Sequence, residues 1–383
     1  YDVAYNQTLN VSSNGILAND MAESGILTAA LISPPQHGDI TAFNSDGTFT
    51  YVPDVNYSGQ DSFVYAAATA NGSDQATVTI TVHSNLEFSI ILLPDVQNYY
   101  NYPAVLNTQT QWIADHKDEF NIAFVMTEGD FTNHNNVAEW SISSTAMSIL
   151  DGEVPYAAVV GNHDTGSNMS TRNCSLFNQY FPASRFSSCL SGVYESNHME
   201  NSYHTFTAGG IDWLVFALEF GPRNKILDWA NGIIDANPHR RVIIVTHNYM
   251  YDDDTRVGTG DTWNPHTYAA CTSATGPEAC NDGEEMWTNF VKLHENISFV
   301  FSGHILHDGI GTLVSTGDNG NSVYQMLANY QDQPNGGNGW LRIVTFYPEQ
   351  QKVGVKTYSP YLGLYNTAAD QQFEFTGVDL TVP

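Results

Sequence analysis

Five short apolar segments of this chain each end in a residue that can bind a metal ion. The apolar residues of each segment read as a strand. With the ligand-type residues that end them, the five segments cover residues 92–97, 125–130, 157–164, 244–247 and 299–304. In open α/β sheets, loops converge beyond the carboxyl ends of the strands, and ligands collect in that crevice. The five strand ends are therefore predicted to build one metal site at one edge of a sheet.

The side chains at these strand ends offer carboxylate, amide and imidazole donors. Such a set suits zinc, manganese, iron or magnesium in a two-metal hydrolytic centre, where a carboxylate bridges ions about 3.5 to 4 Å apart. Asp130 follows Gly129 at the end of the second segment and is the candidate bridge. An isolated Gly-Asp would indicate only a turn, but here four other motifs accompany it.

The order of these motifs resembles that of the calcineurin-like metallophosphoesterase family. The matching motifs are, in chain order, Asp95-Val96-Gln97, Gly129-Asp130, Gly161-Asn162-His163-Asp164, the lone His247 and Gly303-His304. The resemblance covers residues 88–338, which is most of the chain. It implies a four-layer αββα sandwich of the mixed α/β (α+β) class, in which two packed sheets are flanked by helices.

The resemblance also implies a role for each matching residue. The implied metal ligands are Asp95 and Gln97 for the first ion, Asp130 as the bridge, and Asn162, His247 and His304 for the second ion. His163 would act on the phosphate as a general acid or charge stabiliser, and Asp164 would orient its imidazole ring. The implied cofactors are two divalent ions, drawn from Zn, Mn, Fe, Mg and Ca.

The chain departs from the family pattern at the first metal ion. Gln97 stands where many relatives have histidine, and its amide either binds the ion or only hydrogen-bonds a water or the neighbouring aspartate. Relatives commonly carry Gly-His-x-His, but Leu306 occupies the last position of that motif. His307 comes one residue late and needs a local bulge to face the site. Asn133 and Asp308 are the other candidate donors.

The implied activity is that of a metal-dependent phosphoric ester hydrolase. A phosphatase or phosphodiesterase of this kind attacks phosphorus with a hydroxide that bridges the two ions. The departures at Gln97 and Leu306 support an alternative, a catalytically weakened phosphoesterase fold that serves as a binding or adhesion protein. A serine hydrolase is less well supported, because no Gly-x-Ser-x-Gly element precedes a helix.

Two domains are predicted, an all-β module over residues 1–83 and the phosphoesterase-like region over residues 87–383, with a short linker at 83–85. Apolar and polar residues alternate in the module at 47–52, 61–65 and 76–82, with turn residues between these runs. The phrases at 14–20, 35–38 and 45–51 resemble bacterial cadherin-like, immunoglobulin-like sandwiches. Such modules are spacers or adhesion units, so contact with a surface or a carbohydrate is a candidate role.

Loop carboxylates of such modules sometimes bind calcium. The candidates here are Asp20, Asp46 and Asp61. Because aspartate is a common turn residue, we interpret them as solvated turn residues instead.

Strands alternate with helices from residue 88 onward. Apolar residues at helical spacing predict helices beginning at Pro103 and covering 137–150 and 226–234. The last apolar runs, 340–346 and 353–358, predict a hairpin that completes the second sheet.

The chain is strongly acidic, with a formal net charge of -29 and only 12 lysine and arginine residues. No nucleic-acid-binding groove is expected on such a surface. The sequence has no apolar run of about 18 residues, so no membrane span is predicted. The chain starts at Tyr1 without methionine, which indicates that a leader has been removed or that the end has been trimmed. The acidic balance suits a salty or extracellular medium, so a secreted, extracellular or periplasmic location is expected.

Four cysteines form two local pairs, Cys174 with Cys189 and Cys271 with Cys280. Two sequential disulfides, each closing a polar loop in an oxidising compartment, are favoured over the other connectivities and over four buried thiols. Residues 251–282, which contain the second pair, form a long insertion that is predicted to overhang the site.

Overall fold

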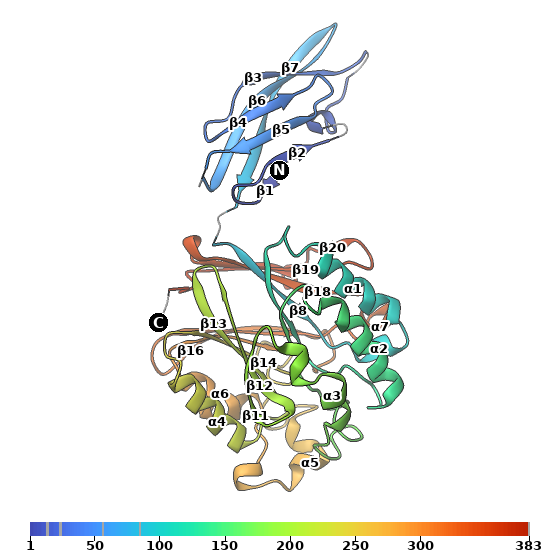
Figure 1. Cartoon of the computed structure of the whole chain (residues 1–383), viewed down its shortest axis with the longest axis vertical. Helices are drawn as coiled ribbons and strands as arrows, with labels where there is room; N and C mark the ends of the chain where they lie inside the picture. The colour runs from blue at the N-terminus through green and yellow to red at the C-terminus, as the bar shows by residue number, and fades with distance from the viewer. Residues whose placement is uncertain (13–14, 23–24, 56, 84–85, 382–383) are drawn as a thin grey trace. The chain divides into compact units, whose positions relative to one another are not determined.

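The computed structural model describes residues 1–12, 15–22, 25–55, 57–83 and 86–381. The chain forms two compact units, Tyr1–Glu87 and Phe88–Pro383 (Figure 1). Asn14, which belongs to one of the module's motifs, and the predicted linker residues Ser84 and Asn85 lie outside the described residues. Within the described part, no helix combines the length and the apolar character needed to cross a membrane.

The N-terminal unit consists of two antiparallel-rich sheets. The four-stranded sheet has the order β1 (Asp2–Val3), β7 (Gly72–Val82), β6 (Gly59–Thr69) and β3 (Thr28–Ser33). The three-stranded sheet has the order β2 (Leu9–Val11), β5 (Phe49–Pro53) and β4 (Gly38–Phe43). Alternate residues of these strands, among them Phe49, Tyr51, Phe63 and Ile80, share one apolar core. The predicted sandwich is confirmed.

Asp61 is not the solvated turn residue that we expected. Its side chain is buried, and its oxygens accept hydrogen bonds from the backbone N–H groups of Gln36 and His37 and from the Tyr51 hydroxyl. Asp46, in contrast, is an exposed turn residue, as interpreted. The Asp61 carboxylate therefore ties a turn to the core of the sandwich, because a buried charge requires hydrogen-bond partners.

The larger unit contains two seven-stranded sheets (Figure 1). The first has the order β10 (Tyr156–Ala157), β9 (Ile122–Thr127), β8 (Phe88–Leu93), β18 (Leu341–Tyr347), β19 (Lys352–Ser359) and β20 (Leu364–Asn366), with β21 (Gln372–Thr376) also paired to β19. The second has the order β11 (Leu190–Glu195), β12 (His198–Ala208), β13 (Ile211–Leu218), β14 (Arg241–Thr246), β15 (Ile297–Ser302), β17 (Ser322–Ala328) and β16 (Ile310–Thr316).

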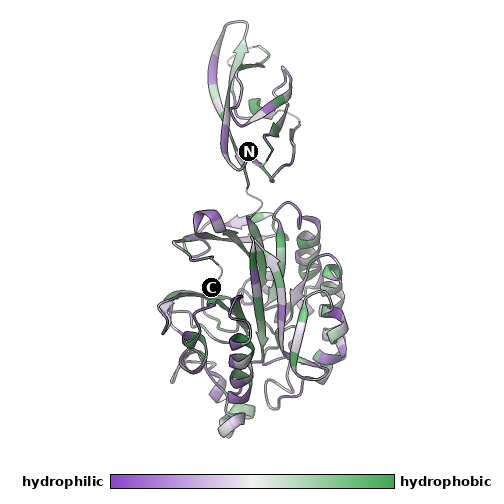
Figure 2. Ribbon diagram, turned by 60° about the vertical axis from the view of Figure 1, so that its left-hand side comes forward, coloured by the Kyte–Doolittle hydropathy of each residue, from purple (hydrophilic) through white to green (hydrophobic). Residues whose placement is uncertain are grey.

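Helices cover the outer faces of both sheets. Those packed in the core of the first sheet are α1 (Pro103–Asp115) and α2 (Val137–Met147), and those on the second are α4 (Asn224–Asp235) and α6 (Gly283–Asn289). Along β13, Trp213 and Val215 belong to the core between the sheets, whereas Leu214 and Phe216 pack with α4. This alternation is the strand period of two, and it makes the sheets apolar on both faces. The strands at the centre of the larger unit are accordingly largely green, the hydrophobic end of the scale (Figure 2). The four-layer αββα sandwich is confirmed.

The remaining helical segments are short. They are η1 (Gly15–Leu17), η2 (Gln97–Tyr100), η3 (Ser148–Leu150), α3 (Ser175–Tyr180), η4 (Ala183–Phe186), η5 (Pro265–Thr267), α5 (Ala269–Thr272), η6 (Gly276–Glu278), η7 (Val291–Leu293), α7 (Pro334–Gly337) and η8 (Pro348–Gln350). The helix predicted over 137–150 is thus α2 followed by a 3₁₀ turn.

The C-terminal hairpin forms, but it lies in the first sheet, so its predicted place in the second sheet is wrong. Strand β18 pairs antiparallel with β8, with Val344 opposite Ile90. The run predicted as a strand over 156–160 pairs only at Tyr156 and Ala157, with β9. Both outcomes depend on partners that are distant in sequence, which local periodicity does not identify.

One of the two predicted disulfides is present. Cys271 is bonded to Cys280, whereas Cys174 and Cys189 are buried free thiols, so the first predicted pair is wrong. The Cys189 Sγ atom instead lies 3.4 Å from Nδ1 of His204, which is on β12 of the second sheet. Both cysteines thus act as small core residues.

Burial lowers the pKa of His204 to about 3. In the unfolded chain histidine takes up a proton below about pH 6.5, so protons favour unfolding between these two values. We expect this side chain to remove about 1.4 kcal/mol of stability per pH unit as the pH falls through that window.

Melting temperatures measured from pH 7 to 3 test this expectation. The wild type should lose stability more steeply than His204→Gln, while replacement of the exposed His239 by glutamine serves as the control. Parallel curves for wild type and His204→Gln would contradict it.

Candidate metal centre

Five of the six predicted ligands lie in the loops that follow strands. Asp95 follows β8, Asp130 follows β9 and Asn162 comes after β10, all in the first sheet. His247 follows β14 and His304 comes after β15, both in the second sheet. The strands in each group run parallel, so their carboxyl ends meet at one edge. The centre therefore draws its residues from both sheets, and the prediction that the edge of a single sheet supplies them all is wrong.

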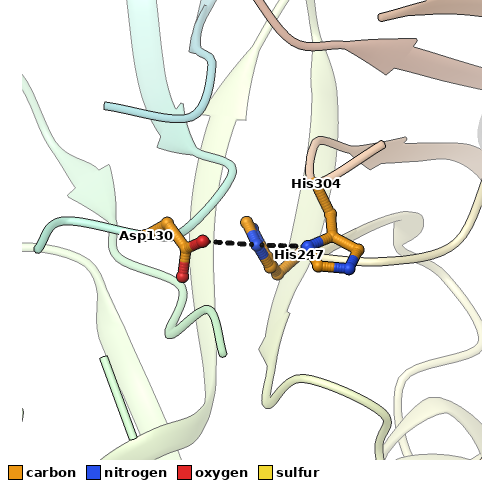
Figure 3. Close-up of side chains that lie close together, drawn as sticks. All are labelled: Asp130, His247 and His304. Carbon is orange, nitrogen blue, oxygen red and sulfur yellow. Dashed lines mark hydrogen bonds and ion pairs between the residues drawn. The ribbon is translucent and has the colours of Figure 1, made fainter. Parts of the chain in front are cut away.

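Four of these residues gather around one ring nitrogen. The Nε2 atom of His247 lies 3.1 Å from Asp130 Oδ2, 3.1 Å from Asn162 Oδ1 and 3.1 Å from His304 Nδ1. Figure 3 shows Asp130, His247 and His304 pointing toward one another. One ligand atom from each of these residues lies within 4.8 Å of the other two. Around a tetrahedral ion with bonds of about 2.0 Å, ligand atoms lie about 3.3 Å apart. The donor spacing fits one bound ion.

Backbone carbonyl groups fix the orientation of both histidine rings. His247 Nδ1 lies 2.6 Å from the carbonyl oxygen of Glu128, and His304 Nε2 lies 3.2 Å from that of Trp263. A carbonyl oxygen only accepts, so each of these nitrogens carries the proton. In the neutral rings the lone pairs of His247 Nε2 and His304 Nδ1 are left for a metal ion, which is the usual arrangement of a ligating histidine.

The backbone around the cluster adopts unusual conformations. Asp130 and His304 have positive φ angles of 51° and 71°. Gly129 has a φ of +97°, and a Cβ atom there would lie 2.6 Å from His247 Nδ1. Such conformations cost energy and occur where the surrounding structure imposes them, often at functional sites. Gly129 is thus required both for its φ and for the close approach of His247.

The charges of the cluster shift the pKa values of its members. Burial alone would lower the pKa of His247, but Asp130 outweighs this effect and raises it to about 9. Burial, assisted by His247, lowers the pKa of His304 to about 3. Burial and the charge of Asp130 raise the pKa of Asp95. A bound divalent cation would relieve this repulsion between the two carboxylates.

The residues predicted to hold the first metal ion offer oxygen donors. Asp95 is buried, its Oδ1 accepts a hydrogen bond from Gln97 N at 2.9 Å, and its Oδ2 has no hydrogen-bond partner among the described residues. The Gln97 side chain donates from Nε2 to Asn133 Oδ1 at 2.5 Å. An orphaned carboxylate oxygen beside Asp130 fits a hard cation. Asn133 is a partner of Gln97 instead of a separate candidate ligand.

The histidine that is missing from the last motif has no substitute at the pocket. Leu306 lines the pocket at that position. His307 has a φ of 67°, but its Nδ1 lies 2.7 Å from Asp252 Oδ2 and its side chain is more than half exposed. The Asp308 carboxylate accepts from Ile310 N at 3.1 Å. The first position is therefore poorer in nitrogen ligands than the second.

Asp164 does not contact the ring of His163 as predicted. The Nδ1 atom of His163 lies 2.8 Å from the carbonyl oxygen of Asn133, which takes the orienting role. Asp164 is fully buried and acts as a brace between two loops. Its oxygens accept from the N–H groups of Phe131, Thr132 and Gly161 and from the Thr132 hydroxyl. The orienting role predicted for Asp164 is wrong, because these donors occupy both of its oxygens.

The cluster opens into a pocket of about 270 Å³. Residues 251–282, here called the strap, contribute Trp263 and Tyr268 to its wall, and the Tyr268 hydroxyl lies 3.2 Å from His304 Nε2. The prediction that this insertion overhangs the site is confirmed. The Cys271–Cys280 disulfide closes the strap beside Tyr268. The strap thus holds a histidine of the cluster as well as covering it.

Sequence reasoning missed several polar residues of the pocket. They are Asn98, Asn168, Gln331 and Asp332. Gln331 and Asp332 could have been found, because they follow β17, which runs parallel to β15 and so ends at the same edge. No comparable signal marks Trp263 and Tyr268 within the long strap.

Two stretches of the chain match known families. Residues 1–81 match the bacterial Ig domain, and residues 88–308 match the calcineurin-like phosphoesterase family. The second match covers more than half of the chain. This protein therefore belongs to the calcineurin-like phosphoesterase family.

Individual relatives are distant. The uncharacterized protein YvnB of Bacillus subtilis (strain 168) is 28% identical over 285 residues, which are 72% of this chain and 20% of that protein. This chain thus spans about one-fifth of its length. Purple acid phosphatase PPD1 from yellow lupin seeds is 10% identical, with a TM-score of 0.45 over 91% of this chain and 69% of that one. GAP50 of Plasmodium is 10% identical, with a TM-score of 0.39 over 76% and 90%.

The close approach of Gly129 to His247 generates a stability prediction. Gly129→Ala should lower the free energy of unfolding by about 1–3 kcal/mol, the cost of a strained backbone. The loss should be larger still, because the new methyl group collides with the ring of His247. Gly152→Ala is the matched control, since Gly152 also has a positive φ, of +80°, but no atom lies within 4 Å of a Cβ there. If urea denaturation gave the same loss of unfolding free energy for both variants, the collision would have no effect.

Proposed function

We propose that this protein hydrolyses phosphate esters with divalent metal ions as cofactors. The observation that carries the proposal is the placement of three donor atoms, each 3.1 Å from His247 Nε2, at the floor of a pocket. The proposed ligands are Asp130, Asn162, His247 and His304 for one ion, and Asp95, Asp130 and the Gln97 amide for the other. When bound, such ions act as Lewis acids and lower the pKa of water.

The residues of the chain position the ester and move the proton. His163 lines the pocket, and its backbone N–H donates to Asp130 Oδ1 at 2.9 Å, which ties the proposed acid to the proposed bridge. In its protonated form the ring keeps Nδ1–H on the carbonyl of Asn133 and offers Nε2–H to the departing oxygen. Asn162 is held by Asn168, whose Oδ1 accepts from Asn162 Nδ2 at 2.6 Å.

We further propose that the protein works outside the cytoplasm. The Cys271–Cys280 disulfide supports this location, because disulfides persist in oxidising compartments. The bacterial Ig domain is proposed to act as a spacer or as a contact to a surface or a carbohydrate.

A second candidate function is binding without turnover on a weakened phosphoesterase fold. It is favoured by the lack of an imidazole at the first metal position, where Leu306 lines the pocket. The two functions differ in turnover, because binding alone leaves the ester intact.

The donor sets predict unequal retention of the two ions. The purified wild type should keep about one zinc equivalent after dialysis, since two imidazoles hold the second position and only oxygen donors the first. Added manganese should fill the first position reversibly. The double variant Gln97→His/Leu306→His should keep both ions, as measured by elemental mass spectrometry. Two ions held firmly by the wild type would contradict the assignment.

Removal of the proposed bridge tests the function itself. Asp130→Ala should abolish metal-dependent hydrolysis of aryl phosphates, a loss of at least about 1,000-fold, because the catalytic metal is no longer held. Asp228→Ala, at an exposed position of α4, is the control for a lost aspartate. Circular dichroism reports whether the fold is kept. Unchanged activity in the Asp130 variant, or none in the wild type with any divalent metal, would overturn the proposal.

A further inference from the structure

The walls of the pocket carry negative charge and polar groups but no lysine or arginine. None of the 12 basic residues of the chain lines this pocket. Three arginines are paired with carboxylates: Arg172 and Arg223 with Glu219, and Arg256, within the strap, with Glu284. Positive charge at the proposed site must therefore come from bound metal ions and from histidine.

Carboxylates surround the place where the phosphate would bind. Asp95 and Asp130 lie at the proposed metal centre, and the exposed Asp332 lines the pocket. A phosphate monoester carries between 1.5 and 2 negative charges at neutral pH by the usual estimate of about 6 for its second pKa. A diester carries a single charge. With no basic side chain to accept the additional charge and a carboxylate nearby to repel it, this pocket favours the diester.

Gln331 adds an acceptor that the protein does not satisfy. Its backbone is held in place, because its N–H donates to Asn329 Oδ1 at 3.0 Å and its carbonyl accepts from Asn98 Nδ2 at 3.1 Å. The residue is only 9% exposed and lines the pocket, and its side-chain Oε1 is buried without a hydrogen-bond partner in the part of the chain that is described. A buried acceptor without a donor is costly, so rotation of this pocket-lining side chain to let Oε1 accept from a hydroxyl group of a ligand would be favoured.

We propose that the substrate is a phosphodiester whose alcohol group bears a further hydroxyl, which donates to Gln331 Oε1. This inference rests on the proposed function and deepens it. A pocket of about 270 Å³ suits a small alcohol such as a glycerol group.

The proposed reaction balances with water alone. The oxygen of water bonds to phosphorus, the bond from phosphorus to one alcohol oxygen breaks, and His163 delivers a proton to that oxygen. The products are an alcohol and a phosphate monoester, and the remaining proton is released to solvent. The monoester is a poor substrate for the same pocket because of its higher charge.

The first arm of the test compares ester classes. The full chain with added manganese is assayed with bis(4-nitrophenyl) phosphate and with 4-nitrophenyl phosphate. The diester should have the higher kcat/KM by at least about tenfold, as expected when like charges face each other. Asp332→Asn should reduce that ratio by favouring the monoester. A preference for the monoester overturns this inference but leaves the proposed function standing, whereas no hydrolysis of either ester overturns both.

The second arm tests the hydroxyl contact. Gln331→Leu should raise KM for bis(glycerol) phosphate about tenfold more than for bis(4-nitrophenyl) phosphate, since one hydrogen bond to the ligand is lost. Gln372→Leu, at an exposed position of β21, is the matched control and should leave the ratio of the two KM values unchanged. Thermal unfolding shows whether each variant folds. An equal rise for both substrates would assign Gln331 a structural role and overturn the contact.

Discussion

The approach of three donor atoms to one nitrogen of His247 is the interaction on which the centre depends. Asp130 and Asn162 come from the first sheet, and His247 and His304 come from the second. The residues are buried, so their charges and lone pairs require partners within the protein or a bound cation. The cluster is therefore a link between the two sheets as well as the proposed site of chemistry.

The rest of the structure holds that cluster in place. Asp164 braces the loops that carry Asp130 and Asn162 by accepting hydrogen bonds from both. Gly129 allows His247 to approach closely, and its backbone could not accept a larger residue without strain. Trp263 contributes only a carbonyl oxygen to the centre, but that contact sets which nitrogen of His304 is free. A metal site requires such supporting contacts as much as its ligands.

The two proposed metal positions differ in chemistry. The second position has two imidazoles, an amide and a carboxylate, whereas the first has Asp95 and Asp130 with an amide nearby. Membership of the family establishes the fold and the type of centre, but activity resides in the particular residues of the site. The strap residues at the pocket and a pocket lining without lysine or arginine are also features of this particular site.

Local patterns in the sequence determined the alternation of strands and helices, the N-terminal sandwich and the strand-end residues of the centre, because each depends on residues that are close together in the chain. The αββα class followed from the resemblance in motif order. Strand-end position alone placed Asp130 beside Asp95, but Asp130 and His247 follow strands of different sheets, so only the resemblance in motif order placed those two together. Only the tertiary structure decided that Asn133, and not Asp164, orients His163. It also decided that Cys189 faces His204 and that the C-terminal hairpin joins β8. These outcomes depend on contacts between distant segments, for which the sequence carries no local period or motif.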